Sequence, residues 1–316
     1  RRLSRAQDLM RARTLLVLVI GACAVAGWAL TSATPAMIPN LAALEGAADA
    51  QRGKVFFDAG GCASCHATPG QDDRLRLGGG LELKSPFGSF IAPNISSHPR
   101  DGIGAWKVAD LIYAMQWGVS PNGQHYYPAF PYTTYARAKS ADIADLMAYL
   151  RTLPSVEGKA PDHKLAFPFN IRRGVGFWKL ANFNRRTISN DFTHDAVWNR
   201  GRYLTEAFAH CAECHSARDM TGAIDETYRY AGGADMEGAG WVPNISQHSG
   251  GIADWSAKDI AWMLKSGDTP EGDVVGGSMK SVVKNMAELS DDDREAIAVY
   301  IKSLPARVSP PKPPKK

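Results

Sequence analysis

The stretches CASCH, residues 62–66, and CAECH, residues 211–215, decide the fold of this chain. Each has two cysteines separated by two residues and followed directly by a histidine, and the second stretch lies 149 positions after the first. Two thiols about one helical turn apart can form thioether bonds to the two vinyl groups of a porphyrin, and the adjacent imidazole then reaches the iron. The spacing therefore predicts a covalently attached haem c in each half of the chain.

The predicted haem-binding residues are Cys62, Cys65 and His66 in the first motif, and Cys211, Cys214 and His215 in the second. The two histidines would be the proximal ligands of the two irons. A disulfide, a thioredoxin-like redox motif or a zinc ribbon would use the same cysteine spacing. Because a zinc site would need the two pairs to converge, and each pair has its own histidine in its own repeat, we interpret both motifs as haem sites.

The two halves of the chain repeat one another beyond these motifs. The sequence PNIS occurs at 93–96 and at 243–246, Trp106 matches Trp255, and Gly118 matches Gly267. These landmarks all keep an offset of 149 or 150 positions. An internal repeat of this kind indicates two tandem copies of one domain.

Each half has the pattern of a small helical domain. Apolar residues at helical spacing predict helices at 105–117 and 254–266, and a helix is also expected at 47–57. Gly53 in that helix is small enough to let another helix cross closely, and Gly201 stands in the matching place. Each half then ends in an amphipathic helix, which we expect Ser140 or Ser290 to cap and a proline to stop.

No alternating strand pattern of useful length is present, so the predicted fold is all-α with long loops. The loop at 67–103 is longer than compact domains normally have without internal structure, and a large buried cofactor would account for it. The predicted organisation is a basic segment with a membrane anchor at 1–35, a first haem domain at 45–155, a connector at 156–194, a second haem domain at 195–306, and a basic, proline-rich tail at 307–316.

The N-terminus has the pattern of a membrane anchor. Arginines at positions 1, 2, 5, 11 and 13 precede a run from Leu15 to Leu30 that contains no charge. With its flanking residues the run is about 20 residues long, enough to cross a bilayer as one helix. We expect an uncleaved single-pass helix with the arginines in the cytoplasm. Cleavage after Trp28, or lipidation at Cys23, is the alternative.

The composition excludes some functions. The chain has 316 residues, of which 45% are hydrophobic and 22% charged, so it can bury two ordinary cores. Its net charge is only +4, and part of that lies in the two tails, so no nucleic-acid partner is expected.

Several motifs together resemble the multihaem cytochrome c subunits of bacterial membrane-bound alcohol, aldehyde and gluconate dehydrogenases. These are the two CxxCH motifs and PNIS repeats, YPAFPY at 127–132, FPFNIR at 167–172 and WNRG at 198–201. The resemblance covers about 47–304 and implies two tandem cytochrome c domains behind a single N-terminal transmembrane helix. The chain has two haem domains where the best-known members have three.

The resemblance also implies roles for further residues. The carbonyls of Pro93 and Pro243 would accept a hydrogen bond from the proximal imidazoles. Trp106 and Trp255, or Asn94 and Asn244, would bind haem propionates, with capping and packing as the competing roles. Met279, twelve residues after Gly267, would be the sixth ligand of the second iron.

The first repeat differs at the sixth ligand. Phe130 lies twelve residues after Gly118 and cannot bind iron. Met115 at the end of the preceding helix and His125 in the loop are the candidates, and an open or water-bound iron is the third possibility. Arg172, Arg173, Arg185 and Arg186 in the connector could neutralise propionates, although a solvated basic face explains them equally well.

These features predict a dihaem electron-transfer protein in the cytoplasmic membrane, with its haem domains in the periplasm. It would receive electrons from a periplasmic dehydrogenase or a quinol-oxidising complex and deliver them to a terminal oxidase or a soluble cytochrome c. No catalytic residue is identifiable, so we expect no enzyme activity of the chain by itself. The alternatives are a dihaem enzyme with an open first haem, such as a peroxidase or a thiosulfate-type dehydrogenase, and a structural subunit of a respiratory complex.

Overall fold

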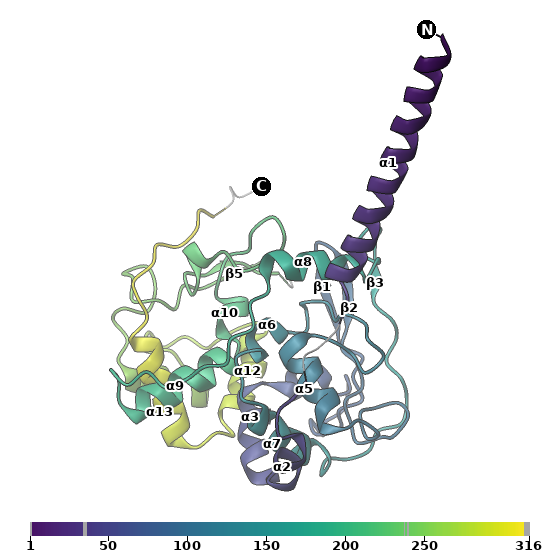
Figure 1. The fold of residues 1–316 in the computed structure, drawn as a ribbon. Helices are drawn as coiled ribbons and strands as arrows, with labels where there is room; N and C mark the ends of the chain where they lie inside the picture. Colours follow the sequence, from purple (N-terminus) through teal and green to yellow (C-terminus); the bar gives the residue numbers. More distant parts are fainter. Residues whose placement is uncertain (1, 34–36, 237, 239, 313–316) are drawn as a thin grey trace.

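The computed structural model describes residues 2–33, 37–236, 238 and 240–312. Arg1 of the basic segment and residues 313–316 of the tail lie outside the described residues. Helix α1 (Arg2–Leu30) projects alone from a body that contains the rest of the chain (Figure 1). Its stretch Met10–Leu30, 21 residues, is long and apolar enough to span a membrane and is not buried inside the protein. This agrees with the predicted anchor.

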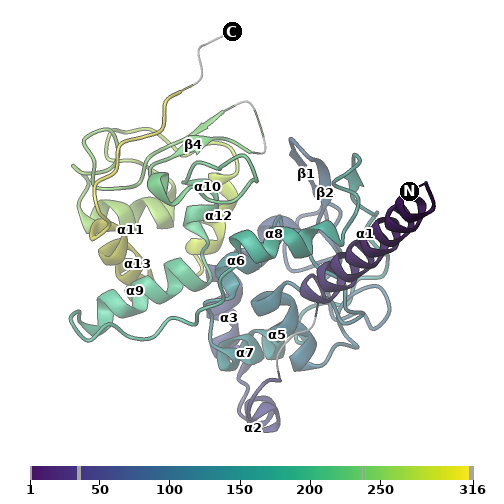
Figure 2. The ribbon, with the colours of Figure 1, turned by 45° about the horizontal axis from the view of Figure 1, so that its top comes forward.

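The body is mostly helical, as the sequence predicts. The first half contains α2 (Leu41–Gly46), α3 (Ala50–Ala59), α4 (Cys62–His66), α5 (Val108–Trp117), α6 (Tyr132–Tyr135) and α7 (Ser140–Leu150). The second half contains α9 (Ala196–Ala207), α10 (Cys211–Cys214), the short 3-10 helix η1 (Glu226–Tyr228), α11 (Ala257–Ser266), α12 (Met279–Met286) and α13 (Asp291–Lys302). The connector forms α8 (Gly174–Asn182). Figure 2 shows the two halves side by side.

The predicted all-α fold class is confirmed, and the structure adds a few short strands to it. Strands β1 (Glu82–Ser85) and β2 (Gly88–Ile91) form a hairpin inside the long loop at 67–103, and β3 (Lys164–Leu165) from the connector extends it. Strands β4 (Gly233–Ala234) and β5 (Trp241–Val242) pair in the second half. These strands have two to four residues each, too short for a period-two pattern to be visible in the sequence.

Two glycines let α3 cross α7 closely in the first half and α9 cross α13 closely in the second. A Cβ atom at Gly53 in α3 would lie 2.0 Å from the carbonyl oxygen of Asp145 in α7, and one at Gly201 in α9 would lie 1.8 Å from that of Ala296 in α13. Both distances are far inside van der Waals contact, so neither position accepts a side chain. The predicted role of these glycines is confirmed.

The cap of α13 is as predicted and that of α7 is not. The Oγ of Ser290 accepts a hydrogen bond from the backbone N–H of Asp293, and Asp291, Asp292 and Asp293 occupy the positive start of the helix. In α7 the N-cap is Lys139, and Ser140 is already helical. Its Oγ instead exchanges hydrogen bonds with the side chain of Gln116, which ties α7 to α5.

The cores of the two halves are joined. Phe56 in α3 stacks on Phe208, just after α9, with ring centroids 4.6 Å apart, and both rings are buried. Tyr203 in α9 packs its edge on Phe56 and Tyr135 in α6 lies 6.4 Å from Phe208, centroid to centroid. The two repeats therefore share one continuous hydrophobic cluster.

Candidate functional site

Each CxxCH motif forms one short helix behind a residue in the left-handed region. Gly61 precedes α4 with φ of 61°, and His210 precedes α10 with φ of 41°. The helical turn places Cys62 and Cys65 on one side, one turn apart, and does the same for Cys211 and Cys214. This is the arrangement that two thioether bonds to one porphyrin edge require.

Both motif histidines bond to the predicted proline carbonyls. The Nδ1 of His66 lies 2.8 Å from the carbonyl oxygen of Pro93, and the Nδ1 of His215 lies 2.8 Å from that of Pro243. Because a carbonyl only accepts, Nδ1 carries the proton in each ring, and the lone pair of Nε2 remains for a metal. The two repeats thus present the same oriented imidazole.

Two glycines that sequence reasoning missed hold the motif histidines through backbone hydrogen bonds. The backbone N–H of Gly79 donates to the carbonyl of His66, and that of Gly232 donates to the carbonyl of His215. A Cβ at Gly79 would lie 2.4 Å from the carbonyl carbon of Pro93, and one at Gly232 2.9 Å from that of Pro243. Both glycines have positive φ. The sequences GGG at 78–80 and AGG at 231–233, each before a PNIS motif, are the signal that could have revealed them.

Burial tunes the titrating groups of both motifs. It lowers the pKa of His66 and of His215, which keeps both imidazoles neutral at neutral pH, the form that binds a metal. It raises the pKa of Cys62 to about 12 and that of Cys211 to about 12. By exposure, Cys62 and Cys211 are half-buried and Cys214 is exposed.

The residues fit two haem groups and do not fit a zinc ribbon. Among the described residues no group of three or more His, Cys, Asp or Glu side chains could hold a metal ion. Each motif instead offers one neutral imidazole and a cysteine pair, which is the donor set for a c-type haem.

Asn94 and Asn244 have the competing, structural role. The side-chain amide of Asn94 donates to the carbonyls of Val156 and Gly158, and that of Asn244 donates to the carbonyl of Arg307. Each asparagine thus ties its PNIS segment to the chain that follows the last helix of its domain. Both side chains are buried and already bonded, so propionate binding is not their role in this structure.

Met279 and Phe130, 149 positions apart, hold matching places in the two repeats. Met279 is half-buried at the first residue of α12, a helix that the sequence did not predict. Phe130 is half-buried just before α6 and packs its ring against Tyr126 and Tyr135, with centroid distances of 5.6 Å in both cases. An aromatic cluster therefore occupies the place that a thioether takes in the second half.

Both candidates for the sixth ligand of the first iron are buried, Met115 with 4% and His125 with 6% of its surface exposed. Met115 is buried in α5, where Leu264 of α11 is its buried counterpart. His125 pairs with Val119 in a β-bridge, as exposed Val274 pairs with Asp268 in the second half. The Nε2 of His125 donates to the carbonyl of Thr31 at the foot of α1, over 2.8 Å.

The tryptophans and the connector arginines have other visible contacts. Trp106 and Trp255 are half-buried before α5 and α11, and the indole N–H of Trp255 donates to Glu271. Arg173 stacks on Trp28, and Arg172 stacks on Tyr127 and bonds to the carbonyl of His125. These two arginines thus brace the connector and the anchor.

The two motifs meet across the domain interface, which sequence reasoning missed. Ser64, inside the first motif, accepts a hydrogen bond of 2.6 Å from the side chain of Asn285 in α12. Glu213, at the matching position of the second motif, accepts hydrogen bonds from Thr133 and Thr134 in α6, of 2.7 and 3.0 Å. Each motif therefore touches the distal helix of the other domain, and the relation is reciprocal.

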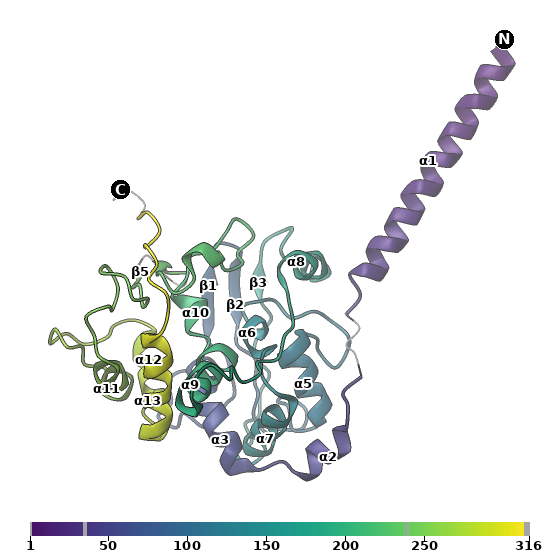
Figure 3. The same cartoon turned by 60° about the vertical axis from the view of Figure 1, so that its left-hand side comes forward.

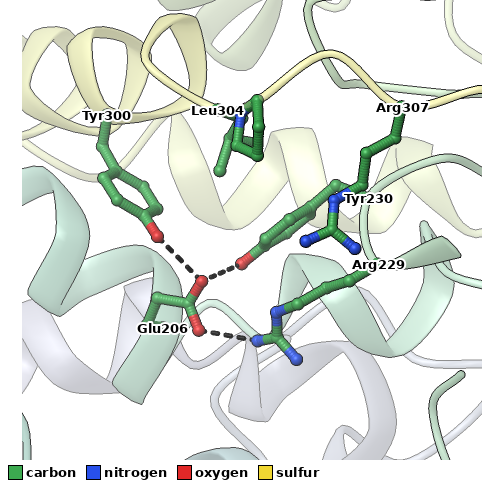
Figure 4. Close-up of a pocket in the computed structure, with 7 residues that line it drawn as sticks. Glu206, Arg229, Tyr230, Tyr300, Leu304 and Arg307 are labelled. Carbon is green, nitrogen blue, oxygen red and sulfur yellow. Dashed lines mark hydrogen bonds and ion pairs between the residues drawn. The ribbon is translucent and has the colours of Figure 1, made fainter. Parts of the chain in front are cut away.

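A buried carboxylate reinforces this interface. Figure 4 shows Glu206 between Tyr230, Tyr300 and Arg229, with contacts of 2.6, 2.9 and 2.6 Å, beside a cavity of about 170 Å³. Arg137 of the first half bonds to the same carboxylate. Burial alone would raise the pKa of Glu206, but Arg229 and Arg137 hold it below its usual range. One ionised carboxylate thus joins an arginine from each domain.

Comparison with known proteins agrees with this geometry. The family model described as cytochrome c matches residues 50–154 and 200–305. A diheme cytochrome c-type protein of Cereibacter sphaeroides is 47% identical over 294 residues, which cover 92% of this chain and 96% of that protein.

Two further relatives are subunits of dehydrogenases. The fructose dehydrogenase cytochrome subunit of Gluconobacter japonicus is 36% identical over 259 residues, 81% of this chain and 52% of that protein. The cytochrome c subunit of the quinone alcohol dehydrogenase of Gluconobacter oxydans is 34% identical over 300 residues, 89% of this chain and 60% of that protein. The chain thus spans little more than half the length of these two.

Proposed function

Because the chain belongs to the cytochrome c family, with two copies of its domain, we propose that it carries electrons between a membrane-bound dehydrogenase and a terminal acceptor. It binds two haem c groups covalently, through the cysteines of the two CxxCH motifs. Haem c supplies an iron that takes up and releases single electrons. The protein's residues set the orientation, surroundings and spacing of the two sites.

The observation that carries this proposal is the equivalence of the two motifs. Both present a neutral imidazole fixed through Nδ1 by a proline carbonyl, at the same distance of 2.8 Å. Two equivalent sites in one rigid body suit a relay of electrons.

The donor and the acceptor belong to the proposal. By their names, the Gluconobacter relatives are subunits of fructose and alcohol dehydrogenases, which supports a dehydrogenase as the electron donor. A quinol-oxidising complex is the alternative donor. We propose a terminal oxidase or a soluble cytochrome c as the acceptor. Arg11 and Arg13, at the N-terminal edge of the apolar stretch Met10–Leu30, favour a cytoplasmic N-terminus, and we therefore propose that the body lies in the periplasm.

For the sixth ligands we propose Met279 in the second domain and Met115 in the first. Met279 opens α12, and the flexible thioether of Met115 is buried within the core that adjoins the first motif. The contact of His125 with Thr31 speaks against that histidine. We further propose that Trp106 and Trp255 line the two haem edges.

Phe130 favours a second candidate function, a dihaem enzyme with an open first iron. Carbon monoxide binding to the reduced protein separates the two functions. A carrier with both irons six-coordinate stays inert, whereas an enzyme with an open site binds one equivalent rapidly at native pH. Electron transfer is tested by stopped-flow reduction with the dehydrogenase, where a carrier takes up two electrons per chain and passes them to cytochrome c.

A further inference from the structure

The connector helix α8 is inverted relative to an ordinary surface helix. Its Lys179 points into the protein, where Nζ donates to the carbonyls of Trp117 and Gly118 over 2.6 and 2.8 Å and lies 4.6 Å from the centre of the Tyr132 ring. Phe177 and Leu180 face outward and are 59% and 58% exposed. Soluble proteins normally turn such a helix the other way, with apolar side chains inside and the lysine in water.

The outward face of α8 continues into the segment before it. Phe167, Phe169 and Ile171 are also exposed. Phe87 of the β1–β2 hairpin packs on Phe169, with centroids 4.9 Å apart, which holds this segment in place. We call Phe167, Phe169, Ile171, Phe177 and Leu180 the connector patch. Five large apolar side chains within one short stretch of chain mark a binding surface.

The connector patch lies at the inner end of the anchor. A Cβ at Gly27 in α1 would lie 3.8 Å from the ring of Phe177, so that ring covers the last turns of α1. Arg173 lies with its guanidinium 3.8 Å from the centre of the Trp28 ring and donates to Thr31. Figures 1 and 3 show α8 at the level where α1 enters the body. A bilayer that contains Met10–Leu30 must therefore end beside α8.

We propose that the connector patch lies in the interfacial layer of the same membrane that α1 spans. Phe177 and Leu180 would be inserted among the lipid headgroups and upper acyl chains, while Lys179 and the arginines fasten α8 to the body and to α1. The inference rests on the part of the proposed function in which α1 is a membrane anchor. It adds a second, lateral contact that fixes the orientation of both haem domains above the bilayer.

The inverted polarity of α8 also favours lipid over a protein partner. The patch lies next to the membrane helix and offers aromatic and aliphatic side chains, while Arg172 and Arg173 of the same segment both lie over aromatic rings. Aromatic residues beside a membrane helix are typical of the interfacial region. A dehydrogenase subunit docked on the patch is the competing occupant.

Photocrosslinking in vesicles tests the proposal. The full-length haem-loaded protein would carry p-benzoylphenylalanine in place of Phe177 or of Leu180, in vesicles of phosphatidylcholine and phosphatidylglycerol without any other protein. Trp262, which is 56% exposed on α11, provides the matched control, and Trp28 in α1 reports on the anchor. Mass spectrometry then counts lipid adducts on each variant, and haem content checks that each one is folded.

We expect lipid adducts at 28, 177 and 180, with yields at 177 and 180 at least about tenfold above the yield at 262. Adducts at 28 but only background at 177 and 180 would overturn the inference while leaving the anchor intact, and would point to a protein partner for the patch. Background at 28 as well would overturn the anchor and the inference with it. Equal yields at 177 and 262 would also contradict a specific contact.

Discussion

The Nε2 atom of His210 lies 3.2 Å from the carbonyl oxygen of Gly60 and donates a hydrogen bond to it. His210 directly precedes Cys211, and Gly60 lies two residues before Cys62. The starts of the two haem-binding motifs therefore touch. Together with Ser64 and Asn285, this contact fixes the separation of the two sites, and a fixed separation is what transfer between them requires.

Loss of the Asn285 side chain should loosen this interface. Asn285 is buried and bonds to both Ser64 and Arg74, each over 2.6 Å. Asn285→Ala would leave both partners without that bond, and we expect a loss of about 2 kcal/mol in the free energy of unfolding. Chemical denaturation measures this loss, with exposed Asn190→Ala as the control that should change little. Equal stability of the two variants would show that the contact does not hold the domains together.

The close helix crossings should not tolerate a methyl group. Gly53→Ala and Gly201→Ala would each force the helices apart, and we expect a cost of more than about 3 kcal/mol or loss of the haem-loaded protein. Gly46→Ala is the control, because a Cβ there meets nothing within 4 Å. The yield of holoprotein and its denaturation midpoint measure the effect. If Gly53→Ala were as stable as the wild type, the close contact between α3 and α7 would be contradicted.

Glu206 should contribute to stability at neutral pH and lose that contribution in acid. Its pKa is below the usual value in the folded protein, so the stabilisation is present above the unfolded pKa and is lost as the pH falls through the folded pKa. Glu206→Gln should cost about 3 kcal/mol at pH 7, because it removes the buried carboxylate that Arg137 and half-buried Arg229 share and leaves Arg229 only its ion pair with exposed Glu226.

Glu206→Gln should also make the free energy of unfolding fall less steeply as the pH is lowered. Glu288→Gln, on an exposed carboxylate, is the matched control. Stability measured from pH 7 down to well below the ordinary glutamate pKa of about 4.3 checks both expectations. If the free energy of unfolding of Glu206→Gln depended on pH as that of the wild type does, the pKa of Glu206 would be the same in the folded and unfolded protein, against this prediction.

Met115→Leu tests the proposed sixth ligand of the first haem. Leucine is the residue that α11 carries at the matching position, Leu264, so the variant should fold. We expect it to bind one equivalent of carbon monoxide in the reduced state, and a variant that stays inert would exclude Met115. Met279→Leu should likewise open one site, so the double variant should bind two equivalents.

The repeated elements could be predicted from the sequence because their signals are local. The CxxCH spacing, the PNIS prolines and Gly53 each depend on chemistry within a few residues or on one close contact. The interface could not be predicted, because Ser64 and Asn285 are 221 positions apart and neither is unusual in its own segment. The cap at Lys139 was missed because Ser140 found a tertiary partner in Gln116.

The connector shows a second limit of sequence reasoning. From the sequence, its arginines could equally neutralise haem propionates or form a solvated basic face. In the structure Arg172 lies over the ring of Tyr127 and Arg173 over the ring of Trp28. Only the three-dimensional placement of α8 beside α1 shows why the polarity of that helix is reversed.

The number of covalently bound haems tests the central claim most directly. A pyridine haemochrome assay on the purified chain, after acid–acetone extraction, should return two equivalents of haem c per polypeptide, with the colour remaining in the protein pellet. His66 and His215 are identically placed, so both sites should be filled. One equivalent per chain, or colour lost to the solvent, would contradict the account.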